Sequence, residues 1–344
     1  MAGRPFAEQA DWCLRMNSPF MERLCRALDT VLDERTEVGR RVLEWPGDPH
    51  TDAMPMRVTG GLNALRRTGR APGLTSLYPP APLAPLPEFE QVLSSVLGEF
   101  DQDLLPWLDG PPQTNETGRA GALFPGLMLI AARTGLPLRL FELGASAGLN
   151  LRLDDYAYRL GGIEAGRTGS PVRIEPQWSG SPPLSASLEV AERRGVDMAP
   201  LDVTDPDVRE RLMAFCWPDQ SDRVTRLEAA LDLAAKDPPP IDKGDAADWT
   251  ERMVEPRSGT ATVVFHSIAF QYFPEETKRR IEDHLHRRGT AASADAPLFW
   301  LQYEAGPGGP GQPTRLGLRS WPEGGEEHLA EGHPHGTDLH WHAD

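Results

Sequence analysis

The chain has 344 residues, of which 39% are hydrophobic, and its 35 basic and 51 acidic residues give a net charge of −16. A chain this acidic lacks the clustered cations that nucleic acids and anionic membranes require, so we expect neither as a partner. Its three cysteines form no CxxC pair and predict neither a disulfide framework nor a zinc cluster.

The first residues lack the apolar run of a signal peptide, and no apolar stretch approaches the roughly 20 residues that span a bilayer. We therefore expect a cytoplasmic protein. Residues 1–112 are predicted to form a helical cap, because apolar residues recur at helical spacing over 6–14, 21–32 and 88–105. Segment 46–87 is predicted to be loop-rich, since it contains Pro46-Gly47-Asp48, Gly60-Gly61 and the run YPPAPLAPLP.

Residues 113–344 are predicted to form a Rossmann-like α/β domain. A helical pattern at 117–134 precedes the apolar run LPLRLFEL at 136–143. Four later apolar segments alternate with helical patterns, which predicts a parallel sheet with crossover helices. The apolar segments are 191–200, 239–249, 260–273 and 296–304, and the helical patterns are 206–216, 221–236 and 274–288.

Three further features complete this outline. An inserted hairpin is expected at about 155–180, and antiparallel strands are expected at about 315–342 after the flexible run AGPGGPGQP at 305–313. Asp219 or Ser221 is expected to cap the helix at 221–236.

The turn ELGASAGLN at 142–150 is the main candidate for a ligand site. Its small residues permit a sharp turn, and the following helix start is expected to supply unpaired N–H groups. Gly144, Ser146 and Leu149 do not satisfy GxGxxG, which disfavours a nicotinamide enzyme. The segment does satisfy GxSxG, so a serine hydrolase using Ser146 stays open, although only helical patterns precede the first strand. A tight turn without a ligand is a further alternative.

ELGASAG also resembles the first motif of class I S-adenosylmethionine-dependent methyltransferases. Three later segments, RGVDMAP at 194–200, GDA at 244–246 and VVFHS at 263–267, are similar to the ends of the second, third and fourth strands of that fold. The resemblance implies that Asp197 binds the ribose hydroxyls, with Glu175 and Asp202 as rivals, and that His266 faces the methyl group as a general base. The remaining cofactor-binding residues that it implies are Glu142, Gly144, Ala145, Ser146, Gly148, Asn150, Asp245 and Ala246.

Several polar residues are candidates for binding a small-molecule acceptor. Gln113, Asn115, Glu116 and Arg119 precede the first strand, where helix capping explains them equally well. Tyr272 is a further candidate, although packing beside neighbouring phenylalanines is equally plausible. No metal is predicted, although five of the nine histidines fall after residue 327, and His340 and His342 would face the same side of a strand.

A broader resemblance covers most of the chain. Strings such as QTNETGRAGALFPG, ELGASAGLNLRLDDYAY, FCWPDQSDR and HPHGTDLHW resemble an uncharacterised bacterial family known only as a domain of unknown function. We predict a methyltransferase that acts on an unknown small molecule. Besides the hydrolase, the alternative is a non-catalytic binding module, in which side chains would fill the space above Gly144 and Gly148.

Overall fold

The computed structural model describes residues 5–306 and 312–343, and these divide into two compact units. The first consists of the chain up to Thr114 together with Asp205–Thr225. The second consists of Asn115–Thr204 and the chain from Arg226 onward. Segment 205–225, which the sequence analysis placed in the α/β domain, therefore groups with the N-terminal helices.

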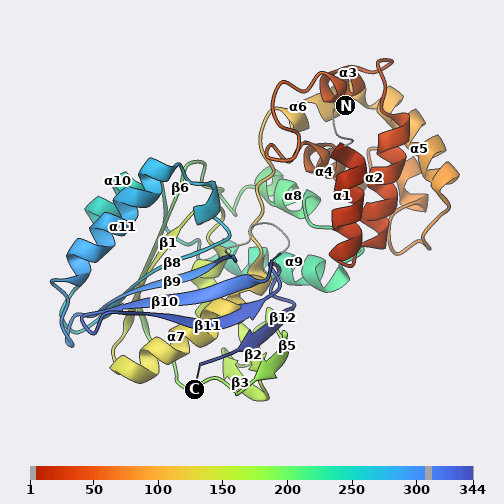
Figure 1. Ribbon diagram of the computed structural model, residues 1–344. Coiled ribbons are helices and arrows are strands. Elements are labelled where there is room, and N and C mark those ends of the chain that lie inside the picture. The colour runs from red at the N-terminus through yellow and green to blue at the C-terminus, as the bar shows by residue number, and fades with distance from the viewer. Residues whose placement is uncertain (1–4, 307–311, 344) are drawn as a thin grey trace. The chain divides into compact units, whose positions relative to one another are not determined.

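The first unit is helical (Figure 1). Its apolar faces, predicted from helical spacing, meet in one core that includes Leu24, Leu62 and Phe89. The helices that build it are α1 (Pro5–Arg15), α2 (Pro19–Val31), α3 (Glu37–Leu43), α4 (Met54–Arg67), η1 (Pro72–Ser76), α5 (Leu86–Glu99), α6 (Asp101–Leu108) and α8 (Pro206–Ala214). Helix α9 (Ser221–Lys236) begins in this unit and ends in the second.

Helix α4 lies within the segment 46–87, which was predicted to be loop-rich, and it overturns that prediction for Gly60-Gly61. Gly60 and Gly61 lie inside this helix, nearly all of which is buried. A Cβ on Gly60 would come within 2.5 Å of the ring of Phe215, and one on Gly61 within 2.9 Å of Trp107. The two glycines therefore let neighbouring elements approach the helix closely, and they do not mark a turn.

The second unit is a mixed α/β structure built on a nine-stranded, mostly parallel sheet, which confirms the predicted fold class at this level. The strand order is β5-β12-β11-β10-β9-β8-β1-β6-β7. The parallel centre consists of β1 (Leu138–Leu143), β6 (Val190–Asp197), β7 (Ile241–Lys243), β8 (Ala261–Ser267) and β9 (Leu298–Ala305).

The central strand β1 is where the order of the sheet reverses. The chain adds β6 and β7 on one side of β1 and then adds β8 and β9 on the other. Helices α10 (Ala246–Met253) and α11 (Glu275–Gly289) cover one face, and α7 (Ala120–Thr134) lies on the other (Figure 1). In open α/β sheets, ligands bind beyond the carboxyl ends of the strands at such a reversal.

The insertion between β1 and β6 forms a small sheet of its own. Strands β2 (Ala157–Leu160) and β3 (Ile163–Gly166) make an antiparallel hairpin, and β4 (Arg173–Ile174) pairs with β2 in parallel. Strand β5 (Gln177–Gly180) then joins the edge of the large sheet beside β12.

The end of the chain is an antiparallel meander of β10 (Thr314–Trp321), β11 (Gly325–Gly332) and β12 (Asp338–Trp341). Most of the run AGPGGPGQP, which was predicted to be flexible, lies outside the described residues. In the part of the chain that the structure describes, no helix has the length and apolar character needed to cross a membrane.

Candidate functional site

The turn after β1 places several polar groups at the reversal point of the sheet. Gly144 and Gly148 have φ values of +70°, and Ser146 has a φ of +53°, which is unusual for a residue with a side chain. The short helix η3 (Leu149–Asp155) starts directly after Gly148.

Five backbone N–H groups of this turn are already used within the protein. Those of Gly144 and Ala145 donate to the Val196 carbonyl, each at 3.0 Å, and that of Ser146 donates to the Asp197 carboxylate at 2.8 Å. The N–H groups of Gly148 and Leu149 donate to the Ala145 carbonyl and to Asn115 Oδ1. The expectation that the helix start supplies unpaired N–H groups is therefore wrong for these five residues, so they do not form a phosphate cradle.

Asp197 ends β6, the strand beside β1, and its carboxylate faces the turn. Its Oδ2 accepts from Ser146 N, and its Oδ1 accepts from Ala199 N at 2.9 Å. A carboxylate has about four lone-pair sites, so both oxygens retain acceptor capacity. The rival acids lie elsewhere: Glu175 follows β4 and pairs with Arg173, and Asp202 accepts from Thr204.

Buried polar atoms around the turn lack partners among the described residues. They are Glu142 Oε2, Ser146 Oγ and both amide atoms of Asn150. Glu142 is only 2% exposed and Asn150 only 1%. Burial raises the pKa of Glu142 well above its usual value, and the nearby Asp197 adds to this rise, while Arg119 opposes it.

His266 is the penultimate residue of β8 and is held by an acid that the sequence analysis did not single out. Its Nδ1 lies 2.7 Å from Glu304 Oε1, which also accepts from Ala269 N at 3.0 Å and Phe270 N at 3.1 Å. Burial raises the pKa of Glu304, but the hydrogen bonds from His266 and the two amides outweigh burial and hold it below its usual value. An ionised Glu304 places the His266 proton on Nδ1, and Nε2 has no partner among the described residues.

Glu304 was detectable in principle from the sequence. It lies at the carboxyl end of the predicted strand 296–304, next to the strand that carries His266. The pairing of these two strands, which brings Glu304 Oε1 to His266, was not part of the prediction.

The residues expected to bind the acceptor have partners of their own. Asn115 is buried and caps η3, and Glu116 accepts from Gly118 N at 2.8 Å and pairs with Arg226. Arg119 donates to the carbonyls of Ser267 and Pro334 at 2.9 and 3.1 Å. Gln113 is half-buried in the last residues of the first unit.

The remaining predicted residues lie around the same edge of the sheet. Asp245 caps α10 by accepting from Ala247 N and Asp248 N, and Ala246 is buried beside it. Tyr272 is 73% exposed. The ligand-binding roles of these residues stay predictions.

The space that a side chain at Gly144 or Gly148 would occupy is filled. A Cβ on Gly144 would lie 2.6 Å from the Ala269 Cβ, and one on Gly148 would lie 2.6 Å from Pro239. Close packing and positive φ therefore explain both glycines. Ile268, beside Ala269, also has a positive φ of 49°, which is strained for a β-branched residue.

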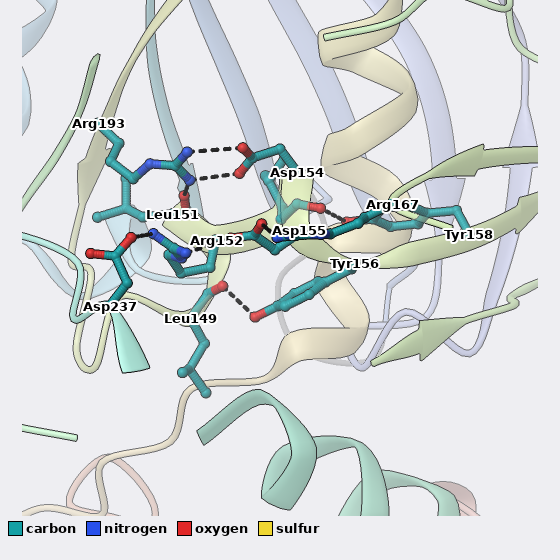
Figure 2. A network of polar contacts seen from close by, with 11 residues as sticks. Leu149, Leu151, Arg152, Asp154, Asp155, Tyr156, Tyr158, Arg167, Arg193 and Asp237 are labelled. Carbon is teal, nitrogen blue, oxygen red and sulfur yellow. Dashed lines mark hydrogen bonds and ion pairs between the residues drawn. The ribbon is translucent and has the colours of Figure 1, made fainter. Parts of the chain in front are cut away.

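A polar network fixes the segment after the turn (Figure 2). Arg193 binds Asp154 with two hydrogen bonds of 2.6 and 2.8 Å and also donates to the Leu151 carbonyl at 2.6 Å. The Tyr156 hydroxyl donates to the Leu149 carbonyl at 2.6 Å. These polar groups satisfy one another, so their role is to hold η3 in place beside the turn.

Fold and site together define a mixed α/β protein with a candidate ligand site at the reversal point of a mostly parallel sheet. Residues 4–341 match the model of the family described as "Uncharacterized protein conserved in bacteria (DUF2332)", so the chain belongs to this family. This confirms the resemblance to an uncharacterised bacterial family. No curated protein and no solved structure matched the chain.

Proposed function

We propose that this protein binds S-adenosylmethionine beyond the carboxyl ends of β1, β6 and β8 and transfers a methyl group to a small-molecule acceptor in the cytoplasm. The observation that carries the proposal is the chemistry of the turn, which combines unpartnered acceptors with backbone N–H groups that are already used, while Asn150 Nδ2 and the Ser146 hydroxyl are its unpartnered side-chain donors. Glu142 Oε2 and Asn150 Oδ1 have no donor among the described residues, and Asp197 retains acceptor capacity. The N–H groups of Gly144 to Ser146, Gly148 and Leu149 are all used.

Unpartnered acceptors together with occupied backbone N–H groups favour a ligand that donates hydrogen bonds and carries no phosphate. S-adenosylmethionine fits because it offers ribose hydroxyls, an adenine amine and an ammonium group. Asp197 is the proposed acceptor for the ribose hydroxyls and Asp245 for the adenine amine, with Glu142, Ser146 and Asn150 around the turn. Dinucleotides fit less well, because their pyrophosphate needs free N–H groups at a helix start.

The arrangement of strands also supports the proposal. Taken in chain order, the parallel strands β1, β6, β7, β8 and β9 lie in the spatial order 3-2-1-4-5. This is the order of doubly wound nucleotide-binding sheets, whose ligand site lies at the reversal point. We therefore propose a class I methyltransferase-type sheet, in which the antiparallel β10 follows β9 directly.

His266 has the chemistry of a general base in this site. Glu304 holds its Nδ1 proton and leaves the Nε2 lone pair available to accept one from an acceptor molecule. A methyl group carried on a sulfonium is transferred with little more than in-line positioning. His266 would therefore matter most for acceptors that must lose a proton.

Calorimetric titration with S-adenosylmethionine and S-adenosylhomocysteine tests the proposal. We expect heat of binding for both ligands, and Asp197→Asn should weaken binding by about tenfold or more, because a hydrogen bond to a charged acceptor contributes about 1.5–3 kcal/mol. Glu175→Gln and Asp202→Asn are matched controls that should leave binding unchanged. Absence of heat for both ligands at sub-millimolar protein would overturn the proposal.

A serine hydrolase is a second candidate, favoured by Ser146. This residue combines GxSxG with a positive φ and an unpartnered hydroxyl, and His266 with Glu304 forms a base–acid pair. No His–Ser146 hydrogen bond occurs among the described residues, which disfavours this candidate. If the protein is a serine hydrolase, a fluorophosphonate probe should label the native protein but not the Ser146→Ala variant. Absence of labelling in the native protein would rule out this candidate.

The packing at Gly144 and Gly148 favours a non-catalytic binding module, in which side chains fill the space above both glycines. Ala269, Phe273, Pro239 and Ile241 lie where a Cβ on these glycines would point. In that case neither S-adenosylmethionine nor S-adenosylhomocysteine would give heat. The same titration therefore separates this alternative from the leading proposal.

A further inference from the structure

Two strands at the end of the chain bring three metal-binding side chains together, far along the sequence from the turn after β1. One candidate ligand atom from each of His328, Glu331 and His342 lies within 4.8 Å of the other two. His328 and His342 are exposed and Glu331 is half-buried, so an ion in solution can reach all three.

A β-bulge explains why His328 and Glu331 share a face. Strand β10 pairs Leu316 with Ala330 and the next residue, Gly317, with His328, so Leu329 is an extra residue in β11. Leu329 and Ala330 are both buried, whereas His328 and Glu331 on either side of them point outward. An extra residue of this kind re-aims the side chains around it.

His342 completes the cluster from the neighbouring strand. Glu331 lies opposite His340 in the β11–β12 pairing, and His342 N donates to the Leu329 carbonyl at 2.8 Å, which continues that pairing. Side chains two residues apart share a face of a strand, so His342 lies on the face that carries His340 and Glu331. The centroids of the His328 and His342 rings lie 4.8 Å apart.

We propose that His328, Glu331 and His342 bind a Zn²⁺ ion on the outer face of β11 and β12, with water in the remaining position. Two imidazoles and one carboxylate form a recognised zinc ligand set, with metal–ligand distances of about 2.0–2.2 Å. Ligand atoms on one ion then lie at most about 4.4 Å apart. Small rotations of exposed side chains bring the observed separation of up to 4.8 Å into this range.

The hydrogen bonds and ion pairs that these side chains already make occupy only some of their metal-binding atoms. Glu331 Oε1 accepts from Arg315 Nε at 3.1 Å, which leaves its second oxygen for the ion. His328 Nε2 lies 3.0 Å from the Ala330 carbonyl and 3.6 Å from Glu331 Oε1, so a metal bound through Nδ1 would leave the first contact intact and one bound through Nε2 would replace it. His340 is not one of the three residues whose ligand atoms meet, although its ring adjoins His342, and its Nδ1 lies 2.8 Å from Ser179 Oγ.

Titration of the chelator-treated full-length chain with ZnCl₂ tests the proposal by calorimetry, with Co²⁺ absorption as an independent readout of coordination. We expect one ion per chain. His328→Ala and His342→Ala should each weaken binding by about tenfold or more, because removing groups that merely orient a ligand already costs about 10–100-fold. Near-UV circular dichroism checks that these variants keep their fold.

Two histidine variants serve as controls. His340→Ala removes an adjacent imidazole outside the proposed set, and His286→Ala removes an exposed imidazole from α11. Both should bind Zn²⁺ within about twofold of the native protein, well short of the loss expected for a ligand. The proposal is overturned if the native protein does not bind Zn²⁺, if His342→Ala binds it equally well, or if His340→Ala loses as much affinity as His342→Ala.

Discussion

Glu142 shows how one buried side chain can combine a cost to folding with a proposed role in binding. It is the penultimate residue of β1, its Oε2 has no partner among the described residues, and burial together with Asp197 raises its pKa. A buried carboxyl without compensating donors disfavours its ionised form. Such a group would remain only if something else, here a proposed ligand that donates hydrogen bonds, makes use of it.

Glu142→Gln is expected to change stability in a pH-dependent way. Because the pKa is raised in the folded state, the native protein loses stability as pH rises through that pKa, whereas glutamine stays neutral. The variant should therefore have the higher free energy of unfolding at pH 8, and the difference should shrink toward pH 4.5, the usual pKa of glutamate. Urea unfolding at several pH values measures this, with the exposed Glu189→Gln as control. A difference that grows at low pH would contradict it.

Hydrogen bonds to a single acceptor hold the segment that follows β8 in position. Glu304 on β9 receives hydrogen bonds from His266 and from the amides of Ala269 and Phe270, at the start of η4 (Phe270–Tyr272). This segment also carries the strained Ile268 and packs against Gly144. Glu304 therefore couples the position of the candidate base to that of the loop beside the turn.

Glu304→Ala should destabilise the protein by about 3 kcal/mol, because it leaves the buried His266 and two half-buried amides without their acceptor. Glu304→Gln retains an acceptor oxygen, so it should lower the free energy of unfolding by less than Glu304→Ala does. Since the Glu304 pKa is lowered, its contribution is present above pH 4.5 and is lost as pH falls through the folded-state value. Hydrogen exchange should accelerate at Ala269 and Phe270 in Glu304→Ala, and unchanged exchange there would refute the assigned role.

Segments far apart in the sequence complete the helical unit. The Asn63 side chain donates to the carbonyls of Ala214 and Cys216, and Arg67 pairs with Glu210. Asp219, which with Ser221 was one of two residues expected to cap the helix at 221–236, has a carboxylate that accepts from Ser18 Oγ at 2.6 Å and Phe20 N at 3.0 Å at the start of α2. The chain must therefore return at 205–225 to finish this unit.

Asp219→Ala should lower the free energy of unfolding by about 1–2 kcal/mol, the usual effect of losing a helix cap. The buried Ser18 hydroxyl also loses its acceptor in this variant. Asp222→Ala, an exposed acid three residues later on α9, is the matched control for the loss of charge. Chemical denaturation measures both variants, and equal stabilities would show that the bond to α2 contributes nothing.

Hydrophobic periodicity in the sequence was sufficient to predict β1, β6, β8, β9, α7 and α11 of the α/β unit, because periodicity depends on neighbours along the chain. It did not predict α10, which begins inside the predicted apolar segment 239–249. Helix α4 escaped prediction because its Gly60 and Gly61 pack against Phe215 and Trp107, which lie far along the chain. The pairing of Glu304 with His266, the cap from Asp219 and the bulge that joins His328 to Glu331 likewise depend on contacts between distant segments. Residue types and spacing in the sequence indicated which groups can carry chemistry, but tertiary packing determined which of them meet, because hydrogen bonds and close packing act over a few ångströms of space and not along the chain.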